Sequence, residues 1–260
     1  MELKLENISL RFSGLEVIKG FNFHVDELGI YALIGPNGAG KTSVINCIFG
    51  FYRPQDGKIF INEILVNNFR PHRIAKLGVA RFFQNIELFR NLSALDNILL
   101  GRHSQIKYGP LSASWYYGRS RREEIRHRRS VEEIIDFLEM EDIRKELVGN
   151  LPYGLKKKVE LGRALAMDPK ILFLDEPTSG MNQEEKEDIV RFILGIKKFW
   201  NIPIIIVEHD MHVVMDISDR VTVMNFGRKI AEGTPENVQS NPAVVEAYLG
   251  TKRDGNETRT

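Results

Sequence analysis

A glycine-rich segment between an apolar run and a helical pattern constrains this chain more than any other feature. Residues 35–42 read Gly-Pro-Asn-Gly-Ala-Gly-Lys-Thr and fit the pattern G-x-x-x-x-G-K-[ST]. The apolar run 30–34 precedes this segment, and a helix-like run, 42–49, follows it. Glycines let successive backbone N–H groups point inward, and the N-terminus of the next helix adds partial positive charge. The sequence therefore predicts a polyphosphate cradle on a strand–loop–helix unit.

The residues of this loop have distinct expected roles. We expect Lys41 to neutralise the β and γ phosphates and Thr42 to give a hydroxyl ligand to Mg²⁺. The simpler alternative is a glycine-rich turn with an exposed lysine. Cys47, inside the following helix, is expected to be buried as a small hydrophobe. The predicted nucleotide-binding residues of the loop are Gly35, Pro36, Asn37, Gly38, Ala39, Gly40, Lys41, Thr42 and Ser43.

Composition excludes several classes of protein. The chain has 260 residues, 43% of them hydrophobic and 27% charged, with 36 basic against 35 acidic side chains. This balance is typical of a globular protein and excludes disordered and collagen-like chains. A net charge of +1 gives no broad basic face for nucleic acid, so we expect no nucleic-acid partner. We expect no signal peptide, no membrane span and, with one cysteine, no internal disulfide.

Two kinds of strand pattern predict an α/β fold with two sheets. Apolar residues alternate with polar ones at 21–25, and 59–61 is similar, which indicates half-buried antiparallel strands. The runs 30–34, 171–174, 204–207 and 221–224 are apolar throughout. Such runs are typical of parallel strands covered on both faces. The sequence therefore predicts a parallel central sheet and a separate antiparallel sheet in one cooperative unit.

A helical insertion is expected between the strands. Periodicity is helical from about 87 to 150, and Ser130 with Glu133 forms a capping-box pattern ahead of apolar residues on one helix face. Within the insertion, 119–129 holds six arginines. This stretch is expected to be a solvated helix with a Glu124–Arg128 pair, or else a docking surface for protein or anionic lipid. The second reading depends on four neighbouring aromatic residues, Tyr108, Trp115, Tyr116 and Tyr117.

Polar side chains follow two of the buried strands. The run 171–174 ends at Asp175 and Glu176, where Asp175 can hold magnesium and Glu176 can orient or deprotonate a water molecule. The alternative for Glu176 is a helix cap or a surface ion pair. His209 follows the run 204–207, and doubly wound sheets place ligand groups at strand ends. Gln84 follows Arg81-Phe82-Phe83 and has no comparable support by itself.

Taken in order, five motifs resemble those of the ATP-binding-cassette ATPases over nearly the whole chain. They are GPNGAGKT, Gln84, LPYGL at 151–155, ILFLDEP and His209. The resemblance implies a P-loop NTPase fold with a RecA-like core, an antiparallel β subdomain and a helical subdomain at about 87–165. It implies one cassette domain over 1–250 with a polar tail at 251–260, and ATP with Mg²⁺ as its ligands.

The resemblance also assigns residue roles. It implies that Glu176, His209, Lys41 and Gln84 are catalytic, and that Thr42, Gln84 and Asp175 hold Mg²⁺. Phe12 resembles the aromatic residue that stacks on adenine, although it could equally be a strand core residue. The signature residues, which would contact ATP bound to the opposite subunit, are Leu151, Pro152, Tyr153, Gly154 and Leu155.

Further segments resemble the ATPase subunits of branched-chain amino-acid importers, namely 207–220, 226–238 and 247–250. The resemblance implies three partners: a second cassette subunit, membrane permease subunits and an extracytoplasmic solute-binding protein. It places the chain at the cytoplasmic face of the cell membrane, held there by the permease. The cargo and the identity of the second cassette are not encoded in this chain.

Two positions depart from the family pattern. Pro152 stands where the signature usually has serine, so a hydroxyl donor is lost. Proline suits the first turn of a helix, and the following amides can still address phosphate. Asn182 stands where the family commonly has aspartate, which bears on communication across a dimer. These departures keep a regulatory cassette with little hydrolysis open, beside a soluble cassette ATPase acting on nucleic acid or ribosomes and a nucleotide kinase.

Overall fold

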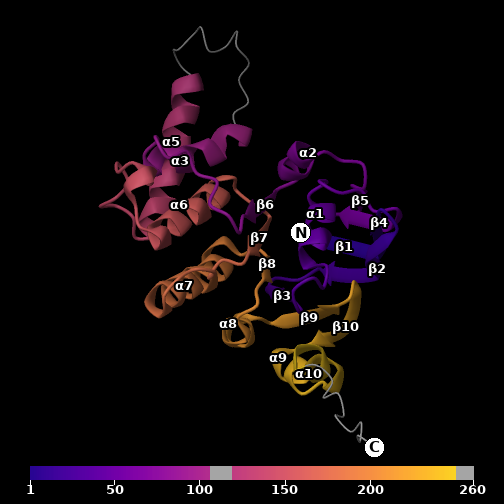
Figure 1. Cartoon of the computed structure of the whole chain (residues 1–260). Helices are drawn as coiled ribbons and strands as arrows, with labels where there is room; N and C mark the ends of the chain where they lie inside the picture. The colour runs from indigo at the N-terminus through magenta and orange to yellow at the C-terminus, as the bar shows by residue number, and fades with distance from the viewer. Residues whose placement is uncertain (106–118, 250–260) are drawn as a thin grey trace, which may run out of the picture.

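The structure is a computed structural model of the chain, and it describes residues 1–105 and 119–249. The four aromatic residues of the possible docking surface and the predicted polar tail at 251–260 lie outside these residues. The N-terminal half of the fold, followed in Figure 1, contains these elements: β1 (Leu3–Phe12), β2 (Leu15–Val25), β3 (Ile30–Ile34), α1 (Lys41–Ile48), β4 (Asp56–Ile61), β5 (Ile64–Leu65), α2 (Pro71–Lys76), β6 (Val79–Phe82), α3 (Ala94–Gly101) and the 3₁₀ turn η1 (Arg102–Gln105).

The C-terminal half begins with the longest helix. Its elements are α5 (Arg119–Phe137), the 3₁₀ turn η2 (Val148–Asn150), α6 (Tyr153–Ala166), β7 (Ile171–Asp175), α7 (Gln183–Trp200), β8 (Ile204–Val207), α8 (Met211–Ile217), β9 (Arg220–Asn225), β10 (Arg228–Gly233), α9 (Pro235–Gln239) and α10 (Pro242–Leu249). Among the described residues, no helix is both long enough and apolar enough to cross a bilayer.

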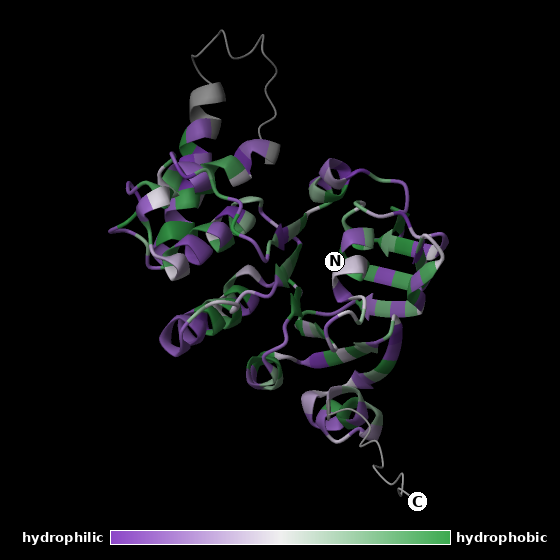
Figure 2. Cartoon of the chain, in the orientation of Figure 1, coloured by the Kyte–Doolittle hydropathy of each residue, from purple (hydrophilic) through white to green (hydrophobic). Residues whose placement is uncertain are grey.

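Both predicted sheets are present. The central sheet has the strand order β10-β9-β3-β8-β7-β6, and only its edge pair, β9 with β10, is antiparallel. The outer sheet has the order β2-β1-β4-β5 and is antiparallel throughout. Green and purple alternate along its strands in Figure 2, because one face is buried and the other faces solvent.

The central strands are apolar throughout because each face of the sheet contributes to a different core. In β3, Ile30, Ala32 and Ile34 pack into a core shared with the helices α3, α5, α6, α7 and α8. The alternate residues Tyr31 and Leu33 pack into a second core with α1 and the outer sheet. Successive side chains on a strand point to opposite faces, so a strand covered on both sides needs no polar position.

The helical insertion packs as a layer beside this sheet. Helices α3, α5 and α6 contact one another, and they lie at one end of the molecule, away from the outer sheet (Figure 1). Val131, Ile134, Ile135 and Leu138 are buried in this layer, as the periodicity predicted. The pair Glu124–Arg128 is also formed, at 3.2 Å.

The predicted capping box at Ser130 is wrong. Helix α5 begins at Arg119, so Ser130 lies in its interior, where its hydroxyl donates to the Arg126 carbonyl at 3.2 Å. A serine that bonds to the carbonyl four residues earlier satisfies its hydroxyl within a helix. The capping box of this fold belongs instead to α7: the Asn182 side chain accepts from the Glu185 amide, and Glu185 accepts from the Asn182 amide.

We predict that Phe173→Ala lowers the free energy of unfolding by about 3–5 kcal/mol. Phe173 is buried in β7, and its ring meets Phe49 edge-to-face with centroids 5.0 Å apart. Urea unfolding followed by circular dichroism measures the change. As a control, Phe226→Ala removes a ring that is 78% exposed and should change the free energy by less than about 0.5 kcal/mol. Equal effects of the two substitutions would contradict this account of the core.

Candidate nucleotide site

The register of the central sheet brings the predicted site residues to one edge. Leu33 of β3 pairs with Val207 of β8, and Val207 pairs with Asp175 of β7. The strands are parallel, so their carboxyl ends coincide and the loops that follow them meet. The phosphate loop, Glu176 and His209 all lie just beyond this row, and Gln84 lies two residues beyond the end of β6.

The phosphate loop is shaped by close backbone approaches. Gly35 and Gly40 have φ of 151° and 106°, values that favour glycine. A Cβ at Gly35 would collide with the Met224 carbonyl, and one at Gly40 would come within 2.9 Å of the Val17 carbonyl. The loop is therefore held against β9 on one side and β2 on the other. This fixes where α1, with Lys41 at its N-terminus, begins.

Lys41 is largely buried beneath the loop. Its ammonium donates to the carbonyls of Gly35 at 2.6 Å and Pro36 at 3.2 Å. Burial lowers the pKa of Lys41, and the carboxylates of Glu176 and Asp175 oppose that decrease. The lysine thus lies within electrostatic reach of both predicted carboxylates. The exposed side chain of Thr42 follows on the first turn of α1.

The two adjacent carboxylates have different environments. Asp175 is buried at the end of β7 and accepts from Arg81 at 2.5 Å, and Arg81 also donates to Asn46 at 3.1 Å. Glu176 has a left-handed backbone with φ of 48°, and its carboxylate accepts from the Gln84 amide at 2.7 Å. The structure thus brings Gln84 and Glu176 together.

His209 lies beside this pair on the loop after β8. Its Nδ1 is 3.9 Å from a Glu176 carboxylate oxygen, and its side chain is 58% exposed. The neighbouring Glu208 is buried and accepts from the Thr178 amide at 3.0 Å, the Thr178 hydroxyl at 2.5 Å and the His209 amide at 3.0 Å. Glu208 therefore ties the loop after β7 to the loop after β8.

The signature residues lie at the start of α6. Pro152 is the N-cap residue rather than part of the first turn, and helix α6 begins at Tyr153. The Tyr153 hydroxyl donates to the Ser179 carbonyl at 3.3 Å, so the signature contacts the loop after Glu176. Gly154 packs so closely against Glu185 that a Cβ there would collide with its carboxylate.

Phe12 is not a core residue. It ends β1 with 43% of its surface exposed, and its ring meets Tyr52 edge-to-face with centroids 5.1 Å apart. The Leu151 side chain is buried, whereas Pro152 and Tyr153 are exposed. Cys47 is buried as expected, and burial raises the pKa of its thiol to about 12.

Several site residues could not be recognised from the sequence. Arg81 and Glu208 have no motif of their own, although the letters around Gln84 and His209 contain them. Tyr248 is another: α10 borders a pocket of about 530 Å³ whose opposite wall is the phosphate loop at Pro36–Ala39. Burial raises the pKa of Tyr248 to about 12, and a backbone hydrogen bond with Gly35 opposes the increase.

A phosphate loop, a strand-end carboxylate pair and a helix bearing the signature define an ATP-binding cassette. The family model described as ABC transporter matches residues 18–179, and one described as branched-chain amino acid ATP-binding cassette transporter matches 228–254. The chain belongs to the ABC transporter family. The predicted family, the P-loop fold class and the ATPase class are confirmed.

Relatives and solved structures agree with this assignment. The high-affinity branched-chain amino acid transport ATP-binding protein BraF of Pseudomonas aeruginosa is 37% identical over 251 residues, covering 95% of this chain and 97% of BraF. LivG of Escherichia coli, with the same description, is also 37% identical, with 95% and 97% coverage. A crystal structure of a nucleotide-free ATP-binding cassette from an ABC transporter has a TM-score of 0.81 and 31% identity, covering 96% of this chain and all of that one. A cassette in its ADP conformation has a TM-score of 0.81 and 30% identity, covering 96% and 99%.

A pH-dependent stability is expected from Glu160, a buried residue of α6. Its carboxylate oxygens have no hydrogen-bond partner among the described residues, and the nearest cation is Arg163 at 3.6 Å. Burial raises the pKa of Glu160 from 4.5 to about 7, against the opposing charges of Lys157 and Arg163. Between these two values the folded protein binds this proton more tightly than the unfolded chain does. The stabilisation is therefore present at low pH and is lost as the pH rises through about 7.

We predict that Glu160→Gln removes this dependence. From pH 5 to pH 8, the free energy of unfolding of the unsubstituted protein should fall by roughly 2 kcal/mol more than that of the variant. Urea unfolding at both pH values measures the difference. Glu133→Gln, on the exposed face of α5, is the control and should behave like the unsubstituted protein. Parallel pH profiles for Glu160→Gln and the unsubstituted protein would contradict the prediction.

Proposed function

We propose that this chain is the ATP-hydrolysing subunit of an importer for branched-chain or related amino acids. The observation that carries the proposal is the strand-end cluster, in which Glu176 lies beside the phosphate loop and is hydrogen-bonded to Gln84. The printed descriptions of the relatives and of the C-terminal family model support the substrate class. The division into one cassette at 1–250 and a polar tail stays a prediction.

The donor atoms at this edge suit a nucleotide and magnesium. Phosphate oxygens would be held by the amides of the loop and by Lys41. Thr42, Gln84 and Asp175 offer hydroxyl, amide and carboxylate oxygens, which are the hard ligands that Mg²⁺ takes. The bound ion would neutralise charge on the phosphates. The exposed ring of Phe12, beside Tyr52, offers an aromatic surface for adenine.

In the proposed reaction, a water oxygen attacks the γ-phosphorus while the bond to the ADP oxygen breaks. Glu176 orients the water and accepts its proton, and Lys41 and His209 stabilise the charge on the transferred phosphoryl group. The signature residues 151–155 of a second cassette would close over the same ATP. Nucleotide then favours the closed pair, and hydrolysis releases it.

We predict that Glu176→Gln keeps ATP binding but lowers turnover by at least about 100-fold, because the amide cannot accept the proton. Phosphate release and binding of a fluorescent ATP analogue, both on the assembled complex, separate the two effects. Glu184→Gln, on the exposed first turn of α7, is the matched control and should keep full turnover. Undiminished hydrolysis in Glu176→Gln would remove this residue from the catalytic role.

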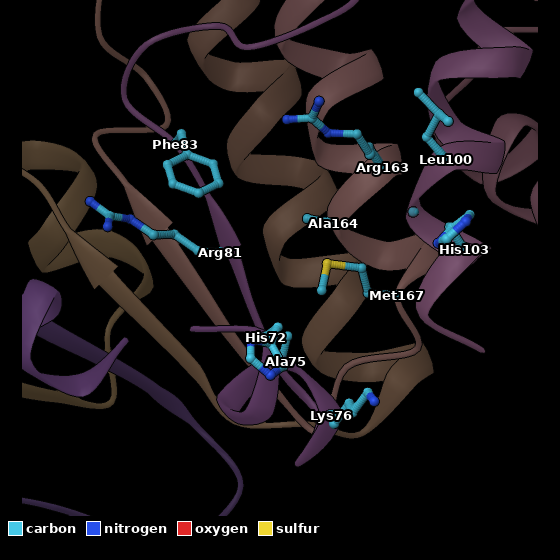
Figure 3. A pocket seen from close by; sticks show the side chains of 11 residues that line it. His72, Ala75, Lys76, Arg81, Phe83, Leu100, His103, Arg163, Ala164 and Met167 are labelled. Atoms are coloured by element: carbon cyan, nitrogen blue, oxygen red, sulfur yellow. The ribbon is translucent and has the colours of Figure 1, made fainter. Parts of the chain in front are cut away.

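A pocket between the central sheet and the helical layer suits the permease. Its volume is about 580 Å³, and Figure 3 shows side chains from α2, β6, α3 and α6 around it. Its walls combine apolar side chains with basic ones, and none of its lining residues is acidic. Its titratable lining residues are His72, Lys76, Arg81, His103 and Arg163. The expected occupant is a permease segment that carries apolar and acidic side chains.

This pocket also adjoins the catalytic cluster. Arg81 lines it and binds Asp175, and Phe83, on its wall, directly precedes Gln84. A permease segment seated here would therefore contact residues next to both magnesium ligands. Docking of this kind would hold the chain peripherally at the cytoplasmic face of the membrane, with an extracytoplasmic solute-binding protein on the other side.

We predict that Leu100→Glu lowers recovery of the permease with this chain about tenfold, because the new carboxylate competes with the partner for the basic residues of the pocket. Leu100 is half-exposed at the end of α3. Leu194→Glu, at a similarly exposed position on α7, is the control. Co-purification from membranes, compared at equal expression, measures the effect. Equal recovery of permease with both variants would rule out the pocket as the docking site.

A further inference from the structure

Lys157 is a buried lysine on α6, one turn after the start of the helix. It is 0% exposed, and its ammonium lies 4.6 Å from the centroid of the Phe82 ring. Burial lowers the pKa of Lys157, and the carboxylates of Glu160, Asp175, Glu176 and Glu208 oppose that decrease. Within residues 1–105 and 119–249, no carboxylate forms a direct ion pair with it. Burying a cation in this way costs free energy, so a specific contact must compensate.

That contact is with the main chain at Gln84. The Lys157 ammonium donates to the Gln84 carbonyl at 2.7 Å, and the Phe83 carbonyl is 3.5 Å away. Arg163, two turns further along the helix, donates to the Glu87 carbonyl at 2.5 Å. Helix α6 thus holds both ends of the segment 84–87 by its main chain.

Gln84 connects this helix to the catalytic carboxylate. Its carbonyl accepts from Lys157, while its side-chain amide donates to Glu176 at 2.7 Å. The start of the same helix, at Tyr153, contacts the Ser179 carbonyl beyond Glu176. A rigid displacement of α6 would therefore move the main chain of Gln84, and with it the group that holds Glu176.

We propose that Lys157 is a positioning residue that couples ATP seated on this chain's signature helix to the release of Glu176 from Gln84. The inference rests on the proposed function, in which the signature helix covers the ATP of the second cassette. A Glu176 carboxylate held by the Gln84 amide is turned away from water, because that amide occupies one of its oxygens. Displacement of α6 by the partner's nucleotide weakens this hydrogen bond, so each site activates the other.

Three consecutive lysines provide a matched test. Lys157→Met keeps a buried chain of similar volume and removes the donor to Gln84. In the assembled transporter, the Hill coefficient of hydrolysis against ATP concentration should fall from above 1 to about 1, and kcat about tenfold, with KM changed less than about threefold. Lys157→Arg, which keeps a donor, should recover most of the cooperativity. Lys158→Met removes a lysine that pairs with Asp188 at 2.9 Å, and it should leave the Hill coefficient unchanged.

A second measurement avoids the variants at Lys157. In the Glu176→Gln complex, addition of ATP should change the rate of amide hydrogen exchange at 83–87. An unchanged exchange rate would overturn the inference, and so would a Hill coefficient that is the same in Lys157→Met as in the unsubstituted complex. An equal loss of cooperativity in Lys158→Met would also overturn it, since the effect would then be general to the helix. A complex that hydrolyses no ATP would instead reject the proposed function.

Discussion

The alignment of parallel strands is the constraint on which the rest of this structure depends. The row Leu33–Val207–Asp175 makes three strands end together, so that their loops share one edge. The row is fixed by packing, since a slip of one residue would exchange the side chains of two different cores. The position of Glu176 beside the phosphate loop is thus a consequence of apolar packing far from the chemistry.

Buried polar contacts then hold the loops at this edge in place. Arg81 ties Asp175 to α1 through Asn46, and Glu208 ties the loop after β7 to the loop after β8. Each of these contacts places a charged group in the interior, where loss of one partner would leave the other uncompensated. Such contacts fix a geometry more than they add stability. The site therefore depends on positions that never touch the substrate.

Helix α6 joins the three surfaces that a transporter cassette uses. Its first turn bears the signature, its buried side holds Gln84 through Lys157, and Arg163 and Ala164 line the pocket proposed for the permease. A helix transmits displacement along its length because its backbone hydrogen bonds keep it rigid. Events at the partner's nucleotide, at the permease and at Glu176 are thereby placed on one mechanical element.

The predictions from sequence succeeded where a pattern reflects local geometry. Apolar runs identified the parallel strands, alternation identified the antiparallel ones, and Gly35–Thr42 marked the phosphate loop. The capping box at Ser130 failed because the helix begins eleven residues earlier, at Arg119, and a cap pattern cannot exclude a continuing helix. The capping role of Asn182 was not predicted, although the chain shows Glu185 three residues later.

The sequence by itself determined the fold class, the phosphate loop and the strand-end carboxylates, because strand period and glycine spacing are local properties of the chain. Only the tertiary structure decided that Arg81 holds Asp175, that Glu208 bridges two loops and that Lys157, rather than Lys156 or Lys158, reaches Gln84. Three lysines in a row are equivalent as letters. A helix turns about 100° per residue, so the packing of α6 against the core selects which one is buried.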